Sequence, residues 1–142
     1  YGSVISDYLI SVTYLENEKI KTLKKEKCEF LYRDSLFKHD KNKIILSAKF
    51  ELIKKDKQEM QNIVKENLLK RKNTQPIEFH NAGSVFRNPI NLSAGKLIEE
   101  SGLKGHNVND AEISTKHANF IINKDNASSA DIIELIRKIQ EE

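Results

Sequence analysis

The chain has 142 residues, of which 38% are hydrophobic and 32% are charged. This length suits one ordinary domain or two small ones. No stretch approaches the roughly 18 apolar residues of a membrane span, and the first residues lack the pattern of a signal peptide. The sequence therefore predicts a soluble, intracellular protein. The lone Cys28 excludes an internal disulfide and is expected to act as a small apolar side chain beside Glu29 and Phe30, and no Cys or His cluster has metal-ligand spacing.

Basic residues are concentrated in the first half of the chain. Residues 1–72 hold 17 Lys and Arg against 11 Asp and Glu, whereas residues 73–142 hold 7 against 10. A basic half of this kind can bind nucleic acid, an anionic membrane or a phosphorylated small molecule. However, acidic residues are interleaved with the lysines, and no aromatic residues punctuate them as a stacking surface requires. A solvated lysine-rich surface is therefore favoured.

Apolar residues alternate with polar ones in the first third of the chain, which predicts strands. Residues 8–15 and 19–23 alternate on either side of a turn at residues 16–18, so they are expected to form a hairpin. Residues 44–53 predict a further strand that is half buried. The first third is therefore expected to be a small sheet.

The periodicity changes to that of a helix over residues 56–72. Asp56 and Glu59 have the spacing of a capping pair at the start of this helix. Because a new kind of element begins here, we place a boundary near residue 54. The sequence therefore predicts a domain over residues 1–54 and another over residues 55–142.

The second half predicts a mixture of short strands and helices. In chain order we expect an extended segment, a helix, a buried strand and a final helix, at residues 83–86, 94–101, 119–123 and 128–142. Ser128 and Asp131 form a capping pair before the final helix. One apolar stripe, by which this helix is expected to pack, consists of Ile132, Leu135, Ile136 and Ile139.

A candidate site lies at residues 82–89, Ala-Gly-Ser-Val-Phe-Arg-Asn-Pro. Ser84 follows a glycine directly, and Arg87 and Asn88 lie within four residues of it, so its hydroxyl stands among groups that can polarise it. The five glycines of the chain form neither a Gly-x-Gly-x-x-Gly motif nor a Walker loop. A loop that cradles the phosphates of a nucleotide cofactor is therefore not expected in this sequence.

Six strings of residues, in this order along the chain, together resemble one enzyme family. They are Tyr32-Arg33-Asp34-Ser35-x-Phe37-Lys38, Arg71-Lys72-x-Thr74-Gln75-Pro76, Ala82-Gly83-Ser84-Val85-Phe86-Arg87-Asn88-Pro89, Ala94-Gly95-Lys96-Leu97-Ile98-Glu99, Gly102-Leu103-Lys104-Gly105 and Ser114-x-Lys116-His117-Ala118-Asn119-Phe120-Ile121-Ile122-Asn123. The family is UDP-N-acetylenolpyruvoylglucosamine reductase, the MurB flavoenzyme of bacterial peptidoglycan precursor synthesis. The short run from Pro76 to Ser84 resembles the subclass that lacks an inserted loop carrying a substrate-contacting tyrosine.

The resemblance implies an α+β fold. Residues 1–54 resemble the latter part of a FAD-binding domain of antiparallel strands, in which Tyr1 and Gly2 match the end of a cofactor-binding motif. Residues 55–142 resemble a small, α/β-layered substrate-binding domain. The family's N-terminal flavin-phosphate loops and its C-terminal catalytic glutamate are expected to lie outside the chain, and that role is not given to Glu141 or Glu142.

The resemblance also implies a reaction in which NADPH reduces FAD and UDP-N-acetylglucosamine enolpyruvate is then reduced to UDP-N-acetylmuramate. Arg33 matches the arginine that stabilises the enolate intermediate, and Ser84 matches the serine that protonates the carbanion. The residues that match substrate contacts are Tyr32, Asn88, Lys104 and His117. Taken alone, each of these four leaves a plainer alternative open: packing, a turn residue, an exposed lysine or a structural hydrogen bond.

We expect the parent enzyme to be a cytoplasmic bacterial monomer that contacts neither nucleic acid nor a membrane, and the chain alone to be inactive. The alternative is a non-catalytic module that binds nucleotide sugars or nucleic acid. The basic first half and the lack of a phosphate loop favour that alternative, whereas the six matched strings favour the reductase.

Overall fold

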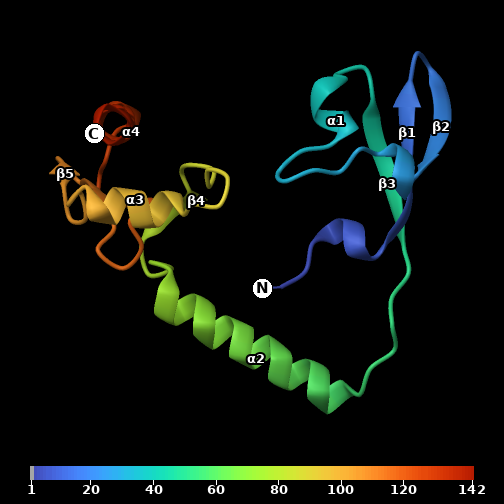
Figure 1. The fold of residues 1–142 in the computed structure, drawn as a ribbon, viewed down its shortest axis with the longest axis horizontal. Helices are drawn as coiled ribbons and strands as arrows, with labels where there is room; N and C mark the ends of the chain where they lie inside the picture. The colour runs from blue at the N-terminus through green and yellow to red at the C-terminus, as the bar shows by residue number, and fades with distance from the viewer. Residues whose placement is uncertain (1) are drawn as a thin grey trace. The chain divides into compact units, whose positions relative to one another are not determined.

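The computed structural model describes residues 2–142, so the predicted cofactor residue Tyr1 lies outside the described part of the chain. The chain divides into two compact units, Tyr1–Glu59 and Met60–Glu142. Each unit combines an antiparallel sheet with helices (Figure 1), which confirms the predicted α+β class. No helix among residues 2–142 is both long and apolar enough to cross a membrane.

The first unit is built on an antiparallel sheet with the strand order β2-β1-β3. The strands are β1 (Leu9–Glu16), β2 (Lys19–Lys24) and β3 (Ile44–Phe50). The first two form the predicted hairpin, because Glu16 pairs with Lys19 across a two-residue turn. Both turn residues have positive φ angles, 48° at Asn17 and 61° at Glu18, as the right-handed twist of a tight hairpin favours.

The core of the first unit lies beneath this sheet. Buried Leu9, Val12 and Cys28 contact the partly buried side chains of Leu23, Phe30 and Phe37. Cys28 is fully buried, and burial raises the pKa of its thiol. The described part of this unit also contains the 3-10 helices η1 (Ile5–Asp7) and η2 (Lys25–Lys27) and the short helix α1 (Leu36–His39).

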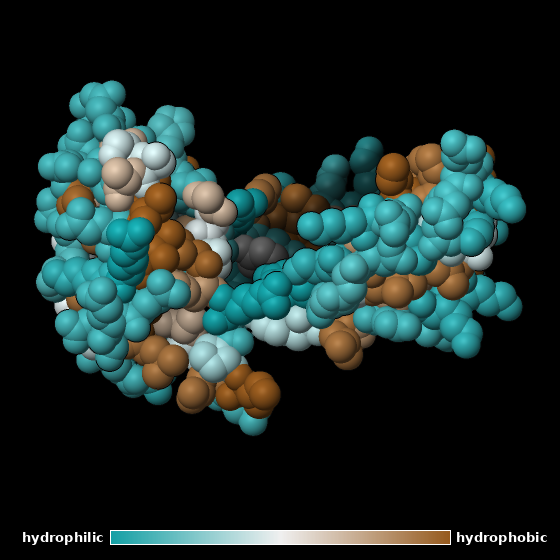
Figure 2. All heavy atoms as spheres, turned by 90° about the horizontal axis from the view of Figure 1, so that it is seen from above, coloured by the Kyte–Doolittle hydropathy of each residue, from teal (hydrophilic) through white to brown (hydrophobic). Residues whose placement is uncertain are grey.

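The strand β3 was predicted to be half buried, and this prediction is wrong. Its seven residues are all exposed, and Ile44, Ile45 and Leu46 are each more than half exposed. Apolar side chains are visible on the surface of this unit at the right of Figure 2. Alternation in a sequence identifies the apolar face of a strand, but burial of that face needs a second layer. Among residues 2–142, β3 pairs with β1 alone.

The second unit contains the remaining elements. Its sheet has the antiparallel order β4-β7-β6-β5, with β4 (His80–Ser84), β5 (Asn107–Val108), β6 (Ala111–Ile113) and β7 (Phe120–Asn123). Its helices are α2 (Lys57–Thr74), α3 (Ala94–Glu100) and α4 (Ser129–Glu141). The boundary between the units falls in the first turn of α2. Asp56 begins this helix as predicted, because its Oδ1 accepts hydrogen bonds from the amides of Gln58 and Glu59.

The core of the second unit lies between the sheet, α3 and α4. Its buried side chains are Ile98, Leu103, Ala111, Ile113, Ala118, Ile121 and Leu135. The predicted capping pair of α4 is present, because Ser128 Oγ accepts from the amide of Asp131 and Asp131 Oδ2 accepts from the amide of Ser128. The predicted stripe of α4 also packs as expected, with Leu135 fully buried.

Replacing Leu135 with alanine should destabilise the second unit by about 2–5 kcal/mol, because the removed atoms leave a cavity in the centre of the core. The matched control is Ile133→Ala, since Ile133 lies on the same helix but is 48% exposed. This change should cost less than about 1 kcal/mol. Urea unfolding followed by circular dichroism measures both values, and equal losses would contradict this assignment of the core.

Candidate functional site

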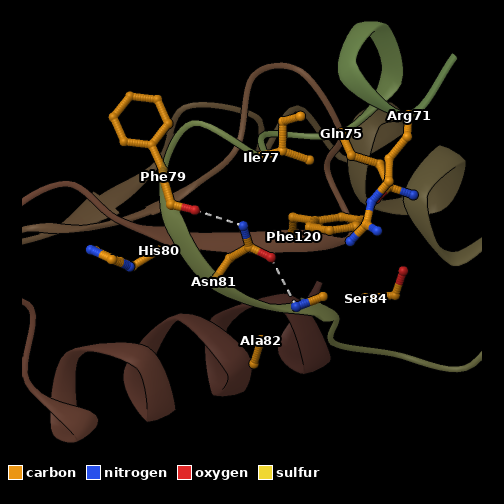
Figure 3. Close-up of a pocket in the computed structure, with 10 residues that line it drawn as sticks. Arg71, Gln75, Ile77, Phe79, His80, Asn81, Ala82, Ser84 and Phe120 are labelled. Carbon is orange, nitrogen blue, oxygen red and sulfur yellow. Dashed lines mark hydrogen bonds between the residues drawn. The ribbon is translucent and has the colours of Figure 1, made fainter. Parts of the chain in front are cut away.

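Ser84 lies at the end of β4, at the edge of a cavity of about 590 Å³. Arg71, Gln75, Asn81 and Phe120 also line this cavity, and Figure 3 shows how they surround it. The serine comes from one strand, the arginine from the end of α2 and the phenylalanine from the adjacent strand β7. Since backbone pairing joins Ser84 on the outer strand β4 to Phe120 on β7, the serine is anchored to the sheet.

The chain just before Ser84 is shaped by Asn81 and Gly83. The amide of Gly83 donates to Asn81 Oδ1 at 2.9 Å, while Asn81 Nδ2 donates to the carbonyl oxygens of Pro76 and Phe79 at 3.0 and 2.8 Å. Gly83 has a φ angle of 86°, which a side chain would strain. The strand register shifts between Asn81 and Ser84. Asn81 and Gly83 therefore determine the backbone conformation from which the Ser84 side chain projects.

The chain just after Ser84 is held by the buried side chain of Asn119. Its Oδ1 accepts from the amide of Phe86 and its Nδ2 donates to the carbonyl of the same residue, both at 2.8 Å. The backbone carbonyl of Asn119 also accepts from the amide of Val85 at 2.9 Å. Sequence reasoning did not identify this contact, although an amide beside the apolar run at 120–122 is a signal for a buried hydrogen bond.

The positive charge in the Ser84 cavity comes from Arg71. Its Nε donates to Gln75 Oε1 at 3.2 Å, and in Figure 3 its guanidinium points into the cavity toward the strand that carries Ser84. Sequence proximity had indicated Arg87 as the polarising charge, but Arg87 lines a separate groove with Leu97 and Ile139. Sequence reasoning gave Arg71 no role, although it begins the second of the six matched strings.

Lys104 and His117, both predicted to contact substrate, line one smaller cavity of about 230 Å³ together with Lys96 and Lys116. Lys104 Nζ lies 2.7 Å from Glu99 Oε1. His117 Nδ1 accepts from the amide of Asn119 at 3.2 Å, so in the neutral ring Nε2 carries the hydrogen. Several lysines and an imidazole donor make this cavity suitable for an anion.

His117 is held in place by close packing. Its ring lies 4.8 Å from the ring of Phe120, and a Cβ atom placed on Gly95 would lie 2.9 Å from His117 Cε1. Gly95 is buried and belongs to α3. Because Gly95 has no side chain, the His117 ring can lie close to α3.

Lys116, which precedes His117, contacts the end of α2 and the segment that follows it. Its Nζ donates to the carbonyl of Lys72 at 3.2 Å and lies 2.7 Å from Glu78 Oε1. The hydrogen bond from this lysine holds the pKa of Glu78 below its ordinary value. The bond thus links the segment that precedes the Ser84 strand to the loop that carries His117.

The predicted Asn88 contact has a structural partner. Asn88 Oδ1 accepts from the amide of Ala94 at 3.1 Å, which fixes the chain before α3. This bond uses the oxygen of the amide and not its nitrogen. Asn88 therefore serves at least as a structural residue here, which was the plainer reading of its position before Pro89.

The other predicted residues, Tyr32, Arg33 and Gly2, belong to the first unit. Tyr32 and Arg33 are the central residues of a tight turn, and Arg33 Cζ lies 5.8 Å from the centre of the Tyr32 ring. Gly2 has a φ angle of 90°, and a Cβ atom there would meet nothing within 4 Å. Among residues 2–142, no group of three or more His, Cys, Asp and Glu side chains is arranged to hold a metal ion.

Comparison with known proteins identifies the family. Residues 75–142 match the family model described as UDP-N-acetylenolpyruvoylglucosamine reductase, C-terminal domain. The segment 75–142 therefore belongs to the UDP-N-acetylenolpyruvoylglucosamine reductase family. The matched segment includes Ser84, Asn88, Lys104 and His117, whereas Arg33 precedes it. This agrees with the resemblance found in the sequence.

Individual reductases are similar over almost the whole chain. The reductase of Agathobacter rectalis is 41% identical over 99% of this chain and 45% of its own length, and that of Carboxydothermus hydrogenoformans is 46% identical over 99% and 47%. The crystal structure of UDP-N-acetylenolpyruvylglucosamine reductase (MurB) from Thermus caldophilus has a TM-score of 0.84 and 35% identity over 96% of this chain and 50% of its own. The chain thus spans about half the length of these reductases, and the comparisons give no support to a nucleic-acid-binding module.

The contact between Glu78 and Lys116 should be visible in a titration. Because the pKa of Glu78 lies below 4.5, the contact stabilises the fold above that pH and is lost as the pH falls through the lowered pKa. Lys116→Met should return the pKa of Glu78 toward 4.5. NMR titration of the Glu78 carboxyl carbon measures this change.

The control for this titration is Lys124→Met, which removes the same charge from a lysine that lies 2.6 Å from Glu112. This variant should leave the titration of Glu78 unchanged. A Glu78 pKa that is the same in the Lys116→Met protein as in the unaltered chain would show that Lys116 does not hold the carboxylate in solution.

Proposed function

We propose that this chain is part of a cytoplasmic, monomeric bacterial enzyme that reduces UDP-N-acetylglucosamine enolpyruvate to UDP-N-acetylmuramate, with NADPH as the reductant and FAD as the cofactor. This oxidoreductase reaction supplies a precursor of peptidoglycan. The observation that carries the proposal is the position of Ser84 beside a cavity that also holds the Arg71 guanidinium, in a chain 41–46% identical to named reductases over nearly its whole length.

In this proposal residues 1–54 serve the flavin side of the enzyme and residues 55–142 the substrate side. When bound, FAD accepts a hydride from NADPH and supplies a hydride to the substrate. Gly2 fits a backbone contact with the cofactor, because its positive φ angle and the open space around it leave the main chain accessible. Tyr1 is the other residue proposed to contact FAD.

Arg33 is proposed to stabilise the charge that develops on the substrate. Hydride addition to the distal alkene carbon leaves negative charge on the carbon beside the carboxylate, and this charge is delocalised as an enolate. A guanidinium is permanently charged and presents paired N–H donors that match a carboxylate. Such a donor favours the intermediate over the starting alkene, which is how a fixed charge accelerates a step.

Ser84 is proposed to give the proton that completes the reduction. Its Oγ–H bond breaks as a new C–H bond forms at the enolate carbon, and the resulting alkoxide is then reprotonated from water. A serine hydroxyl is a weak acid, so a neighbouring cation is needed to stabilise the alkoxide. Arg71 lines the same cavity and can serve this purpose.

The remaining predicted residues are proposed to hold the substrate. Lys104 and the Nε2–H group of His117 line a cavity rich in lysine, which suits the phosphates of a UDP-sugar. Asn88 keeps its amide nitrogen available for a substrate oxygen, because its bond to Ala94 uses the side-chain oxygen. Tyr32 is proposed to contact the substrate beside Arg33.

The test of this proposal is flavin absorbance in the full product of the gene that encodes the chain. The purified protein should be yellow, should bleach on addition of NADPH, and should regain its colour on addition of UDP-N-acetylglucosamine enolpyruvate. Colourless protein that takes up no added FAD, or colour that returns no faster with this substrate than without it, would refute the proposed activity.

Replacing Ser84 with alanine should separate the two half-reactions. Bleaching by NADPH should keep its normal rate, whereas recovery with the enolpyruvyl substrate should slow by about 10²–10⁴-fold, the usual contribution of general acid catalysis. Stopped-flow absorbance measures both rates. The control is Ser101→Ala at the end of α3, which should alter neither rate. Normal recovery in the Ser84→Ala enzyme would exclude the serine as the proton donor.

A further inference from the structure

The backbone of Arg33 adopts a conformation that is unfavourable for its residue type. The amide of Leu31 donates to the carbonyl of Asp34 at 3.0 Å and the amide of Asp34 donates back at 3.2 Å, so Tyr32 and Arg33 form a two-residue turn. Arg33, at the third position, has a φ angle of 57°. Turns with this pattern usually place glycine there, because a Cβ atom crowds the backbone. A long charged side chain remains in this conformation only when its surroundings hold it.

The short helix α1, just after the turn, supplies two side chains that hold it. Lys38 Nζ donates to the carbonyl oxygen of Arg33 at 3.0 Å. His39 Nε2 lies 2.8 Å from Asp34 Oδ2, and the other oxygen of Asp34 accepts from the amide of Ser35. Side chains of α1 therefore bind both Arg33, through its carbonyl oxygen, and Asp34, through its carboxylate.

Resting on the catalytic role proposed for Arg33, we propose that Lys38 and His39 are positioning residues that hold the left-handed backbone of this arginine. The lysine fixes the carbonyl that follows the Arg33 Cα atom, and the histidine fixes Asp34, whose amide closes the turn. The guanidinium is then presented in a fixed direction beside the Tyr32 ring. Sequence reasoning gave His39 no role, and nothing in its spacing distinguished it from other exposed histidines.

A fixed guanidinium is useful because a donor that is already oriented needs no reorganisation when charge develops on the substrate. If the turn loosens, the guanidinium keeps its charge but samples several orientations. The effect of losing Lys38 is therefore expected in the step that uses Arg33 and not in the reduction of the flavin. Substrate affinity should change less than the rate of that step.

The experiment measures stopped-flow flavin reduction and reoxidation in the full product of the gene. Lys38→Met should slow reoxidation by the enolpyruvyl substrate about 3- to 10-fold, which corresponds to the net value of one ordinary hydrogen bond, because the contact is exposed to solvent. Flavin reduction by NADPH should be unchanged. Lys38→Arg keeps a donor and should restore most of the rate. Lys41→Met removes an equal charge from an exposed position three residues further on and should have no effect.

A double variant tests whether Lys38 acts through Arg33. In an Arg33→Met background, Lys38→Met should have no further effect on reoxidation, because there is no guanidinium left to orient. Independent additive losses would overturn the proposal, as would an equal loss in Lys41→Met. If Arg33→Met reoxidises normally, the positioning role fails even though the enzyme is a reductase; failure of the reductase itself appears in the unaltered protein, as flavin that does not recover its colour.

Hydrogen exchange gives a second readout that does not depend on turnover. The amide of Asp34 closes the turn, so its exchange should be about fivefold faster in Lys38→Met and in His39→Leu than in the unaltered protein or Lys41→Met. Unchanged protection in both variants would overturn the proposal whatever the kinetic result.

Discussion

The buried side chain of Asn119 is the contact on which the geometry of the candidate site depends. Its amide satisfies both backbone groups of Phe86, and its own backbone carbonyl and amide bind Val85 and the His117 ring. An asparagine in this environment cannot be replaced by an apolar residue of similar size without leaving two backbone groups unpaired, which is costly in a buried position. One residue thus fixes the chain after Ser84 and the orientation of His117.

Contacts close in the sequence add to this long-range one at two of the site residues. Ser84 leaves a strand whose register is shifted by Asn81 and Gly83, and Arg33 occupies a left-handed turn tied to α1. Both sets of contacts use side chains that bind the backbone close by in the sequence. This arrangement lets an exposed residue keep a defined direction, although little apolar surface is buried around it.

Much of the fold could be predicted from the sequence because it depends on local patterns. The hairpin around Asn17, the capping pair of Ser128 and Asp131, and the stripe of α4 all follow from periodicity and turn chemistry. The short strands β5 and β6 were not predicted, because two or three residues are too few to show a period. The exposure of β3 was missed because the second layer that buries a strand is not encoded in its own alternation.

The segments that carry the candidate site were identified from the sequence, but the spatial neighbours of each residue were not. The strings around Ser84 and His117 identified the segments, and the family comparison agrees with them. The sequence could not show that Arg71 shares the Ser84 cavity and Arg87 does not. Which residues line a cavity depends on the tertiary fold and not on how close they are in the sequence. The same holds for Lys116, whose partners lie 38 and 44 residues away.

The two outer strands of the first sheet differ in a way that matters for handling the protein. The strand β2 carries Lys19, Lys21 and Lys24, and charges of this kind discourage another strand from adding to an edge. The strand β3 instead exposes a row of apolar side chains beside the edge that remains unpaired among residues 2–142. Such an edge is a template for strand addition between molecules, so the isolated chain is prone to aggregate through β3, and a charged residue at Ile45 or Leu46 is the substitution that opposes it.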